Sequence, residues 1–335
     1  GVDTQASPDK QLLLELSAES GVFPHSSGGR KRRISQVDEA PIVVALKRVT
    51  PNADLIPSGA GFTDGERLAL PLWSDSHGLL WFLLDTSLRR SALREGLAQE
   101  LCKDGSRASG LQFASEAVGE LEVQTVPDDS VVLGPQSAGI SGLLGVDFLH
   151  RFDLDLDLQR SICRAWPSGP TLPRGFGLTD AVEIEMREEQ GLLFVNAQLR
   201  GTVCSGTDTA GPLLRALLDL GQTHSACNWR AATEVGVSGP SDPCTRLAGE
   251  WNDVDGRPMD VHEADLGVEL PGRVGGVLPG MRFCGGRLFW LAESLPLLKR
   301  LGFNSKDPMA VLGLDTVGRV RFAISAKHHR LWLPM

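Results

Sequence analysis

The stretch Trp81-Phe82-Leu83-Leu84-Asp85-Thr86-Ser87 decides the fold of this chain, because it recurs as Arg215-Ala216-Leu217-Leu218-Asp219-Leu220-Gly221. Each copy is an apolar strand that delivers an aspartate into a tight turn. A second block follows each copy in the same order: residues 143–147 read Leu-Leu-Gly-Val-Asp, and residues 311–315 read Val-Leu-Gly-Leu-Asp. Two matched blocks in one order indicate an internal duplication.

The repeat extends beyond the two aspartates. Ser91 follows Asp85 at the same spacing at which Ser225 follows Asp219. A third stretch, Asp208-Thr209-Ala210, looks similar in isolation, but it follows polar residues instead of an apolar strand. We therefore interpret it as a loop and not as a third copy.

Length and composition limit the class of protein. The chain has 335 residues, 41% of them apolar and 22% charged, which excludes wholesale disorder and coiled coil. Because single cores stop growing near about 250 to 300 residues, we expect two lobes. The net charge of -9 disfavours binding to nucleic acid. No stretch approaches the roughly 20 continuous apolar residues of a membrane span.

Composition shifts along the chain predict four segments: a polar N-terminal tail at 1–36, a lobe at 37–166, a linker rich in Pro and Gly at 167–178, and a second lobe at 179–335. Both lobes show the alternation of apolar residues that is typical of β-strands, at 68–72, 152–158 and 182–186. A Gly-containing turn at 188–191 predicts a hairpin, and short helices are expected after Arg89, after Trp229 and around 291–301. The expected fold class is all-β.

Residues 65–333 resemble the aspartic proteases, in particular retropepsin-like sequences fused as two lobes in one chain. In that family each lobe contributes an apolar-Asp-Thr/Ser-Gly turn and a later apolar-apolar-Gly segment that packs behind it. Here the turns are 83–87 and 217–221, and the packing segments are 143–145 and 311–313. The resemblance implies a bilobal, all-β fold of the pepsin or retropepsin type, with few short helices and a cleft between the lobes.

The chemistry of that family needs two carboxyl groups that share one proton. One carboxylate acts as a base towards a water molecule, and the other carboxyl acts as an acid towards the substrate carbonyl. The resemblance implies that Asp85 and Asp219 are this catalytic pair. It implies no cofactor and no metal.

Each turn departs from the family pattern at one position. Leu220 stands where a hydroxyl is expected, so Thr86 is expected to lose its reciprocal partner across the lobe interface. Ser87 stands where Gly is expected, which predicts strain of ~1 kcal/mol in the tightest part of the turn. Gly221 keeps the pattern in the second copy. Arg89, just after the first turn, is expected to favour both carboxylates in the ionised form and so to spoil the shared-proton state.

The sequence gives little evidence for the flap, the hairpin that covers the cleft in this family. The chain contains no Tyr, which pepsin-like enzymes commonly place on the flap, although retropepsins manage without it. Candidate flap hairpins with Gly-containing turns lie at 118–120 and at 253–256.

Other chemistries fit the sequence poorly. Residues 153–157 have the opening spacing of a calcium loop but lack its later Gly and Glu, so we interpret them as a strand with a solvated acidic face. His328 and His329 have no neighbouring ligand cluster and are interpreted as surface histidines. The chain lacks a nucleotide-binding glycine loop and a Gly-x-Ser-x-Gly elbow. Its six cysteines form no Cys-x-x-Cys pair; Cys204 and Cys244 could form a disulfide, but we expect free thiols.

Two functions remain open at this point. The departures favour a pseudo-protease that acts as a binding or structural subunit of a larger assembly, holding a peptide or protein partner through its cleft, its sheet edges or its N-terminal tail. The alternative is an active aspartic endopeptidase that uses Asp85 and Asp219. The chain starts with Gly and has no secretory segment, so we expect that an upstream targeting segment has been removed. The resemblance to plant, algal and bacterial sequences suggests a plastid or another organelle.

Overall fold

The computed structural model of the chain describes residues 40–49, 67–102, 105–114, 116–128, 139–173, 176–177, 180–201, 209–252, 258–274, 278–292, 295, 298–299, 302–304, 306–318 and 321–335. The predicted N-terminal tail lies outside these ranges. Within them β-strands predominate, and the helices are short. None of the helices in these ranges has the length and apolar character needed to cross a membrane.

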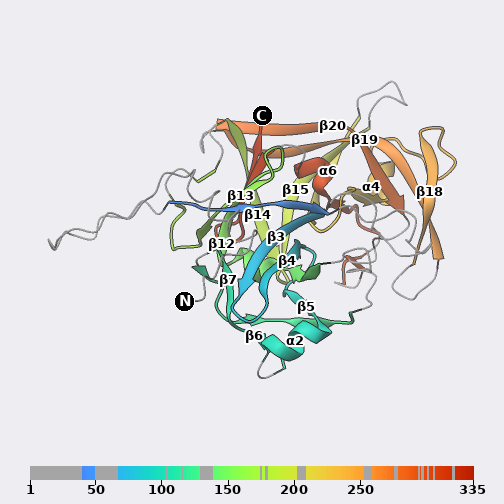
Figure 1. Ribbon diagram of the computed structural model, residues 1–335. Helices are drawn as coiled ribbons and strands as arrows, with labels where there is room; N and C mark the ends of the chain where they lie inside the picture. Colours follow the sequence, from blue (N-terminus) through green and yellow to red (C-terminus); the bar gives the residue numbers. More distant parts are fainter. Residues whose placement is uncertain are drawn as a thin grey trace, which may run out of the picture.

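The first part of the chain is built from short strands and short helices (Figure 1). Its described elements are β1 (Ile42–Ala45), β2 (Lys47–Val49), β3 (Arg67–Ser74), β4 (Gly78–Leu84), β5 (Ala92–Arg94), α2 (Glu95–Leu101), β6 (Arg107–Ala108), β7 (Leu111–Phe113), β8 (Glu116–Ala117), β9 (Leu121–Glu122), β10 (Gln124–Val126), β11 (Ile140–Leu144), α3 (Val146–Leu149), β12 (Phe152–Asp157) and β13 (Ile162–Pro167).

The second part of the chain has longer strands. Its described elements are β14 (Ala181–Glu189), β15 (Leu192–Gly201), β16 (Thr209–Leu218), β17 (Ala226–Asn228), α4 (Trp229–Thr233), β18 (Thr245–Asn252), β19 (Pro258–Val274), β20 (Leu278–Ala292), β21 (Ala310–Leu312), α6 (Leu314–Val317), β22 (Arg321–Ser325) and β23 (Arg330–Pro334).

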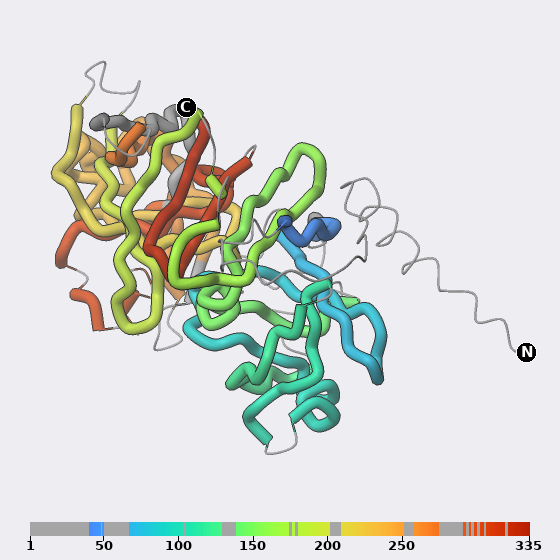
Figure 2. The backbone as a smooth tube through the Cα atoms, turned by 90° about the vertical axis from the view of Figure 1, so that its left-hand side faces the viewer, coloured from blue at the N-terminus to red at the C-terminus, as the bar shows by residue number. Residues whose placement is uncertain are grey.

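The described strands form one large sheet, one medium sheet and one small sheet. The large sheet has the order β1-β13-β12-β22-β23-β14-β15-β16-β21-β17-β20-β19-β18. The medium sheet has the order β10-β5-β11-β4-β3-β7-β8, with β2 beside β3, and the small sheet joins β6 to β9. Strands of both parts meet in the large sheet, where β12 pairs with β22, while the rest of each part forms its own body (Figure 2).

The two parts repeat one arrangement around each aspartate turn. In the first part, β4 runs parallel to β11, and β11 pairs with β5 in the antiparallel sense. In the second part, β16 runs parallel to β21, and β21 pairs antiparallel with β17. A short helix follows each of β5, β11, β17 and β21. This correspondence confirms the predicted fold class, a bilobal all-β fold of the aspartic-protease type with few short helices.

The predicted hairpin is confirmed, and the predicted helices are confirmed in part. The turn between β14 and β15 places Gln190 and Gly191 at φ values of 54° and 78°, the left-handed geometry that two-residue hairpin turns require. The helix after Arg89 is α2, and α4 begins at Trp229. In the third predicted region, 291–301, Leu291 still belongs to β20, whereas residues 298 and 299 are helical.

The acidic face of β12 is buried, so the prediction that it is solvated is wrong. Asp153, Asp155 and Asp157 have exposed fractions of 0%, 3% and 6%. Arg321 of β22 binds both oxygens of Asp155, with Nε–Oδ1 and Nη2–Oδ2 distances of 2.8 and 2.5 Å. Arg164 of β13 lies 3.4 Å from the same carboxylate. Arginines from both neighbouring strands thus replace solvent around Asp155, and one of them joins the two parts of the chain.

Replacing Asp155 by Ala leaves Arg321 and Arg164 without their shared anion inside the large sheet. We expect Asp155→Ala to lower the free energy of unfolding by about 1.5–3 kcal/mol, because it removes the charge-assisted hydrogen bonds that Arg321 donates to a buried carboxylate. Chemical denaturation measures this difference. Asp75→Ala, at an exposed turn, is the control and should change stability by less than about 0.5 kcal/mol. Equal effects of the two substitutions would contradict the structural role of Asp155.

Candidate active site

The structure brings the two predicted aspartates together at the ends of β4 and β16. Asp85 and Asp219 have exposed fractions of only 6% and 5%. The packing segments hold both turns from behind: the backbone N–H of Asp85 donates to the carbonyl of Leu144, and that of Asp219 donates to the carbonyl of Leu312, each at 2.9 Å. The two carboxyl groups therefore occupy matched and buried positions.

A serine fastens each turn to its packing segment. The hydroxyl of Ser91 donates to Oδ1 of Asp147 at 2.8 Å, and the hydroxyl of Ser225 donates to Oδ1 of Asp315 at 2.6 Å. Ser91 also accepts a hydrogen bond from the N–H of the glycine in its packing segment, and Ser225 does the same in its own. The equivalence of Ser91 and Ser225, which the sequence predicts, therefore extends to their contacts.

Thr86 connects the first turn to the second through main-chain atoms. Its hydroxyl donates to the carbonyl of Leu218 at 2.7 Å and accepts from the N–H of Leu220 at 2.8 Å. Thr86 therefore keeps two hydrogen bonds, since both go to the backbone beside Asp219 and neither needs a hydroxyl at position 220. The side chain of Leu220 is fully buried and has no hydroxyl, so it cannot make the reciprocal connection.

Ser87 binds the first carboxylate instead of straining the turn. Its backbone N–H and its hydroxyl both donate to Oδ1 of Asp85, at 3.1 and 2.5 Å. Its φ angle does not lie in the left-handed region. The predicted strain is therefore absent, and the extra side chain acts on Asp85 as a hydrogen-bond donor.

Gly221 is the glycine that the site requires. A Cβ atom at this position would lie 2.4 Å from Cγ of Asp85 and closer than 3 Å to both of its oxygens. The N–H of Gly221 donates to Oδ1 of Asp219 at 2.9 Å. The backbone of the second turn thus lies directly against the first carboxyl group, which only a residue without a side chain allows.

Arg67, which the sequence analysis missed, lies between the two turns. This first residue of β3 is 8% exposed; its Nε donates to the carbonyl of Gly221 at 2.7 Å, and its Nη2 lies 3.4 Å from Oδ2 of Asp85. The signal that could have found it is the β3–β4 hairpin register. Ala69 pairs with Leu83, so position 67 falls opposite position 85.

Burial and the neighbouring charge keep a proton on the second aspartate. Burial raises the pKa of Asp219, the charge of Asp85 raises it further, and the N–H of Gly221 and the cation of Arg67 oppose the rise, which leaves this pKa at about 8. At neutral pH the raised pKa favours the protonated form of Asp219, while hydrogen-bond donors surround Asp85. This is the charge state that proton sharing needs.

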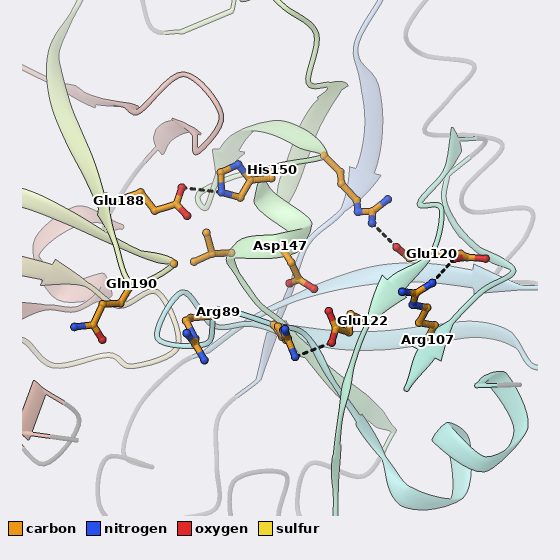
Figure 3. Close-up of a pocket in the computed structure, with 12 residues that line it drawn as sticks. Arg89, Arg107, Glu120, Glu122, Asp147, His150, Glu188 and Gln190 are labelled. Atoms are coloured by element: carbon orange, nitrogen blue, oxygen red, sulfur yellow. Dashed lines mark hydrogen bonds and ion pairs between the residues drawn. The ribbon is translucent and has the colours of Figure 1, made fainter. Parts of the chain in front are cut away.

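Arg89 does not reach the carboxyl pair, contrary to the sequence-based expectation. It is exposed and lines a polar pocket of about 500 Å³, which Asp147, His150 and Glu188 also line (Figure 3). A Cβ atom on Gly191 would lie 2.9 Å from Cδ of Arg89, so this side chain lies against the β14–β15 turn. The cation beside the first carboxylate is Arg67.

Of the two candidate flap hairpins, the structure describes only the first. Residues 118–120 link β8 to β9, which lie in different sheets, so they form no hairpin tip. Arg151 binds the carbonyls of Val118 and Glu120 and holds this link in place. The second candidate, 253–256, lies outside the described residues. The strands that flank it, β18 and β19, do pair as a hairpin, in a register that places Asn252 opposite Pro258.

The remaining sequence signals lie away from the pair. Thr209 and Ala210 begin β16 and lie at the end of the strand opposite to Asp219, so this part of the third Asp-Thr stretch is strand and not loop. His328 and His329 lie in the half-buried turn between β22 and β23. Where side chains are described, no group of three His, Cys, Asp or Glu could hold a metal ion. Cys244 is a free thiol, as expected, and Cys204 lies outside the described residues.

Comparisons with known proteins give only distant similarities. No protein-family model matches the chain. No curated protein matches it significantly either. A retropepsin-like aspartic protease from Rickettsia conorii covers 39% of this chain and 98% of its own length, at 14% identity and a TM-score of 0.25. The match to conglutin gamma, a basic 7S globulin from lupine seeds, covers 88% of this chain and 95% of that protein, at 10% identity and a TM-score of 0.44. The match to basic 7S globulin from soybean covers 87% of this chain and 94% of that protein, at 8% identity and a TM-score of 0.43. Similarities this low carry no information on activity.

Gly221→Ala tests the close approach of the two turns. A methyl group at this position must displace the carboxyl group of Asp85, and we expect the free energy of unfolding to fall by about 1–3 kcal/mol, the usual cost of overpacking. Gly169→Ala is the matched control, because the nearest atom to its Cβ would lie 3.5 Å away. If chemical denaturation gives the same small change for both variants, the turns do not meet as described.

The raised pKa of Asp219 predicts a pH-dependent stability. Below about pH 4 this carboxyl group is protonated in both the folded and the unfolded chain, and between about pH 4 and 8 only the unfolded chain releases the proton. The stability from this group is therefore fully present in acid and is lost as the pH rises, by at most about 1.4 kcal/mol per pH unit.

Urea unfolding of the native protein and of Asp219→Asn at several pH values between 4 and 8 measures this effect. The amide of the variant does not titrate, so the native protein should lose stability relative to the variant as the pH rises. A difference that stays constant across this range would show that Asp219 is not held protonated.

Proposed function

We propose that this chain is an aspartic-protease-fold protein with an impaired catalytic pair, and that it serves as a binding or structural subunit of a larger assembly. The proposal of impaired chemistry rests on one observation: both carboxylate oxygens of Asp85 already face hydrogen-bond donors. Oδ1 accepts two hydrogen bonds from Ser87, and Oδ2 faces Arg67. A general base must take a proton from water on one of these oxygens, and here donors already occupy both of them.

An exposed sheet edge supports the binding role. Strand β18 ends the order of the large sheet, and its residues 246–250 are exposed, with Leu247 at 64%. Such an edge offers backbone N–H and C=O groups to an extended segment of a partner. The partner that fits is a peptide or protein that adds a strand at β18. The N-terminal tail is a second candidate contact.

The alternative function, an active aspartic endopeptidase, is supported by the second half of the site. The raised pKa of Asp219 keeps one proton on the pair at neutral pH, as the reaction requires. The hydrogen bonds of Thr86 still hold the two turns in contact. The two functions therefore differ in one property, which is whether Asp85 can accept a proton from water.

Incubation with a fluorescein-labelled unfolded protein between pH 3 and 8 separates the two functions. Anisotropy reports binding, and gel electrophoresis reports cleavage. The native protein is compared with Asp219→Asn and with Ser87→Gly/Leu220→Thr, which restores the family pattern in both turns. We expect binding without cleavage by the native protein and slow cleavage by the double variant, because the hydroxyl donor of Ser87 is then removed from Oδ1 of Asp85.

Each result of this experiment has a distinct meaning. Cleavage by the native protein that disappears in Asp219→Asn would overturn the impaired chemistry and establish the endopeptidase. Absence of binding by a folded native sample would overturn the proposed binding role.

A further inference from the structure

We infer that Arg67 replaces the missing half of the connection between the two turns and supplies the positive charge that acts on the carboxyl pair. This inference rests on the proposed function, since it concerns the same site, but it assigns a role to a residue outside the Asp-Thr-Gly pattern. Arg67 is a positioning residue: it acts on Asp85 and on the second turn.

Side-chain hydroxyls connect the two turns from one side only. Thr86 extends from the first turn to the backbone of the second, but Leu220 has no hydroxyl with which to return the contact. Arg67 belongs to the first part of the chain, and its Nε donates to the carbonyl of Gly221, 154 positions later. The second turn is therefore held at two points by the first part of the chain, and the second point does not depend on residue 220.

Arg67 also places a positive charge beside Asp85. The guanidinium that binds Gly221 also lies 3.4 Å from Oδ2 of Asp85, and both side chains are only 9% exposed. Little water is present to screen this pair, so the cation favours the ionised carboxylate. The planar guanidinium presents Nε and Nη2 in a fixed geometry, so one side chain binds both acceptors at once. A lysine at this position offers a single ammonium group for two separate acceptors.

A purely structural role of Arg67 predicts a different titration of the carboxyl pair from a role in setting its charge. If Arg67 only stabilises the fold, its removal lowers the unfolding midpoint and leaves the titration of the carboxyl pair unchanged. If it sets the charge state, its removal shifts the titration of Asp219 to higher pH, because the cation of Arg67 lowers the pKa of this group. The titration therefore distinguishes the two roles even when both lower stability.

The experiment compares Arg67→Gln and Arg67→Lys with a matched control, Arg164→Gln. Arg164 also lies 3.4 Å from an aspartate, Asp155, but in the large sheet away from the turns. The carboxyl carbon of Asp219 is followed by NMR against pH in each folded protein. We expect Arg67→Gln to raise the Asp219 midpoint by about one pH unit or more, and Arg67→Lys and Arg164→Gln to leave it within a few tenths of a unit.

A second measurement tests the connection and covers the case in which Arg67→Gln does not fold. Leu220→Thr is made in the native protein and in Arg67→Lys, which keeps the charge but not the fork. We expect Leu220→Thr to raise the unfolding midpoint more in Arg67→Lys than in the native protein, because only Arg67→Lys lacks the second connection between the turns. Equal effects in the two backgrounds would overturn the connection.

An Asp219 midpoint that does not move in folded Arg67→Gln would overturn the charge role. Neither measurement depends on cleavage. Activity of the native protein would therefore contradict the proposed function and leave the role of Arg67 in place.

Discussion

The contact of the Gly221 backbone with the carboxyl group of Asp85 is the constraint on which the rest of the site depends. Because the two turns come from different parts of the chain and meet without an intervening side chain, both carboxyl groups are removed from water. Burial next to a second carboxylate raises the pKa of Asp219 and leaves one proton on the pair. The packing segments and the two matched serines serve the same purpose, since they fix each turn from behind.

The same closeness explains why small changes in the turns have large chemical effects. In the family pattern, two hydroxyls connect the turns and a glycine follows the first aspartate. In this chain, the connection is made by one hydroxyl and one arginine, and the position of that glycine carries a serine that binds the carboxylate of Asp85. The turns keep their positions, while both oxygens of Asp85 face hydrogen-bond donors. A protease fold is thus compatible with a role in binding, because function depends on the site and not on the architecture.

The sequence was sufficient for features that depend on local pattern. The duplicated turns, the pair Asp85 and Asp219 and the β14–β15 hairpin could be predicted because each is encoded by contiguous residues. Features that depend on partners far along the chain could not. The burial of Asp155 follows from Arg321, which is 166 positions away, and no local signal distinguishes it from a solvated acidic face. Arg67 required the register of a hairpin, and the conformation of Ser87 required the position of its hydroxyl against Asp85.

The protonation of the two aspartates at neutral pH is the most direct test of this account. Neutron diffraction from crystals of the native protein in deuterated solvent locates deuterium on each carboxyl group and on the guanidinium of Arg67. We predict deuterium on Asp219 and a fully charged Arg67 donating to the carbonyl of Gly221. Deuterium on Asp85 with an ionised Asp219, or two ionised carboxylates, would contradict this prediction.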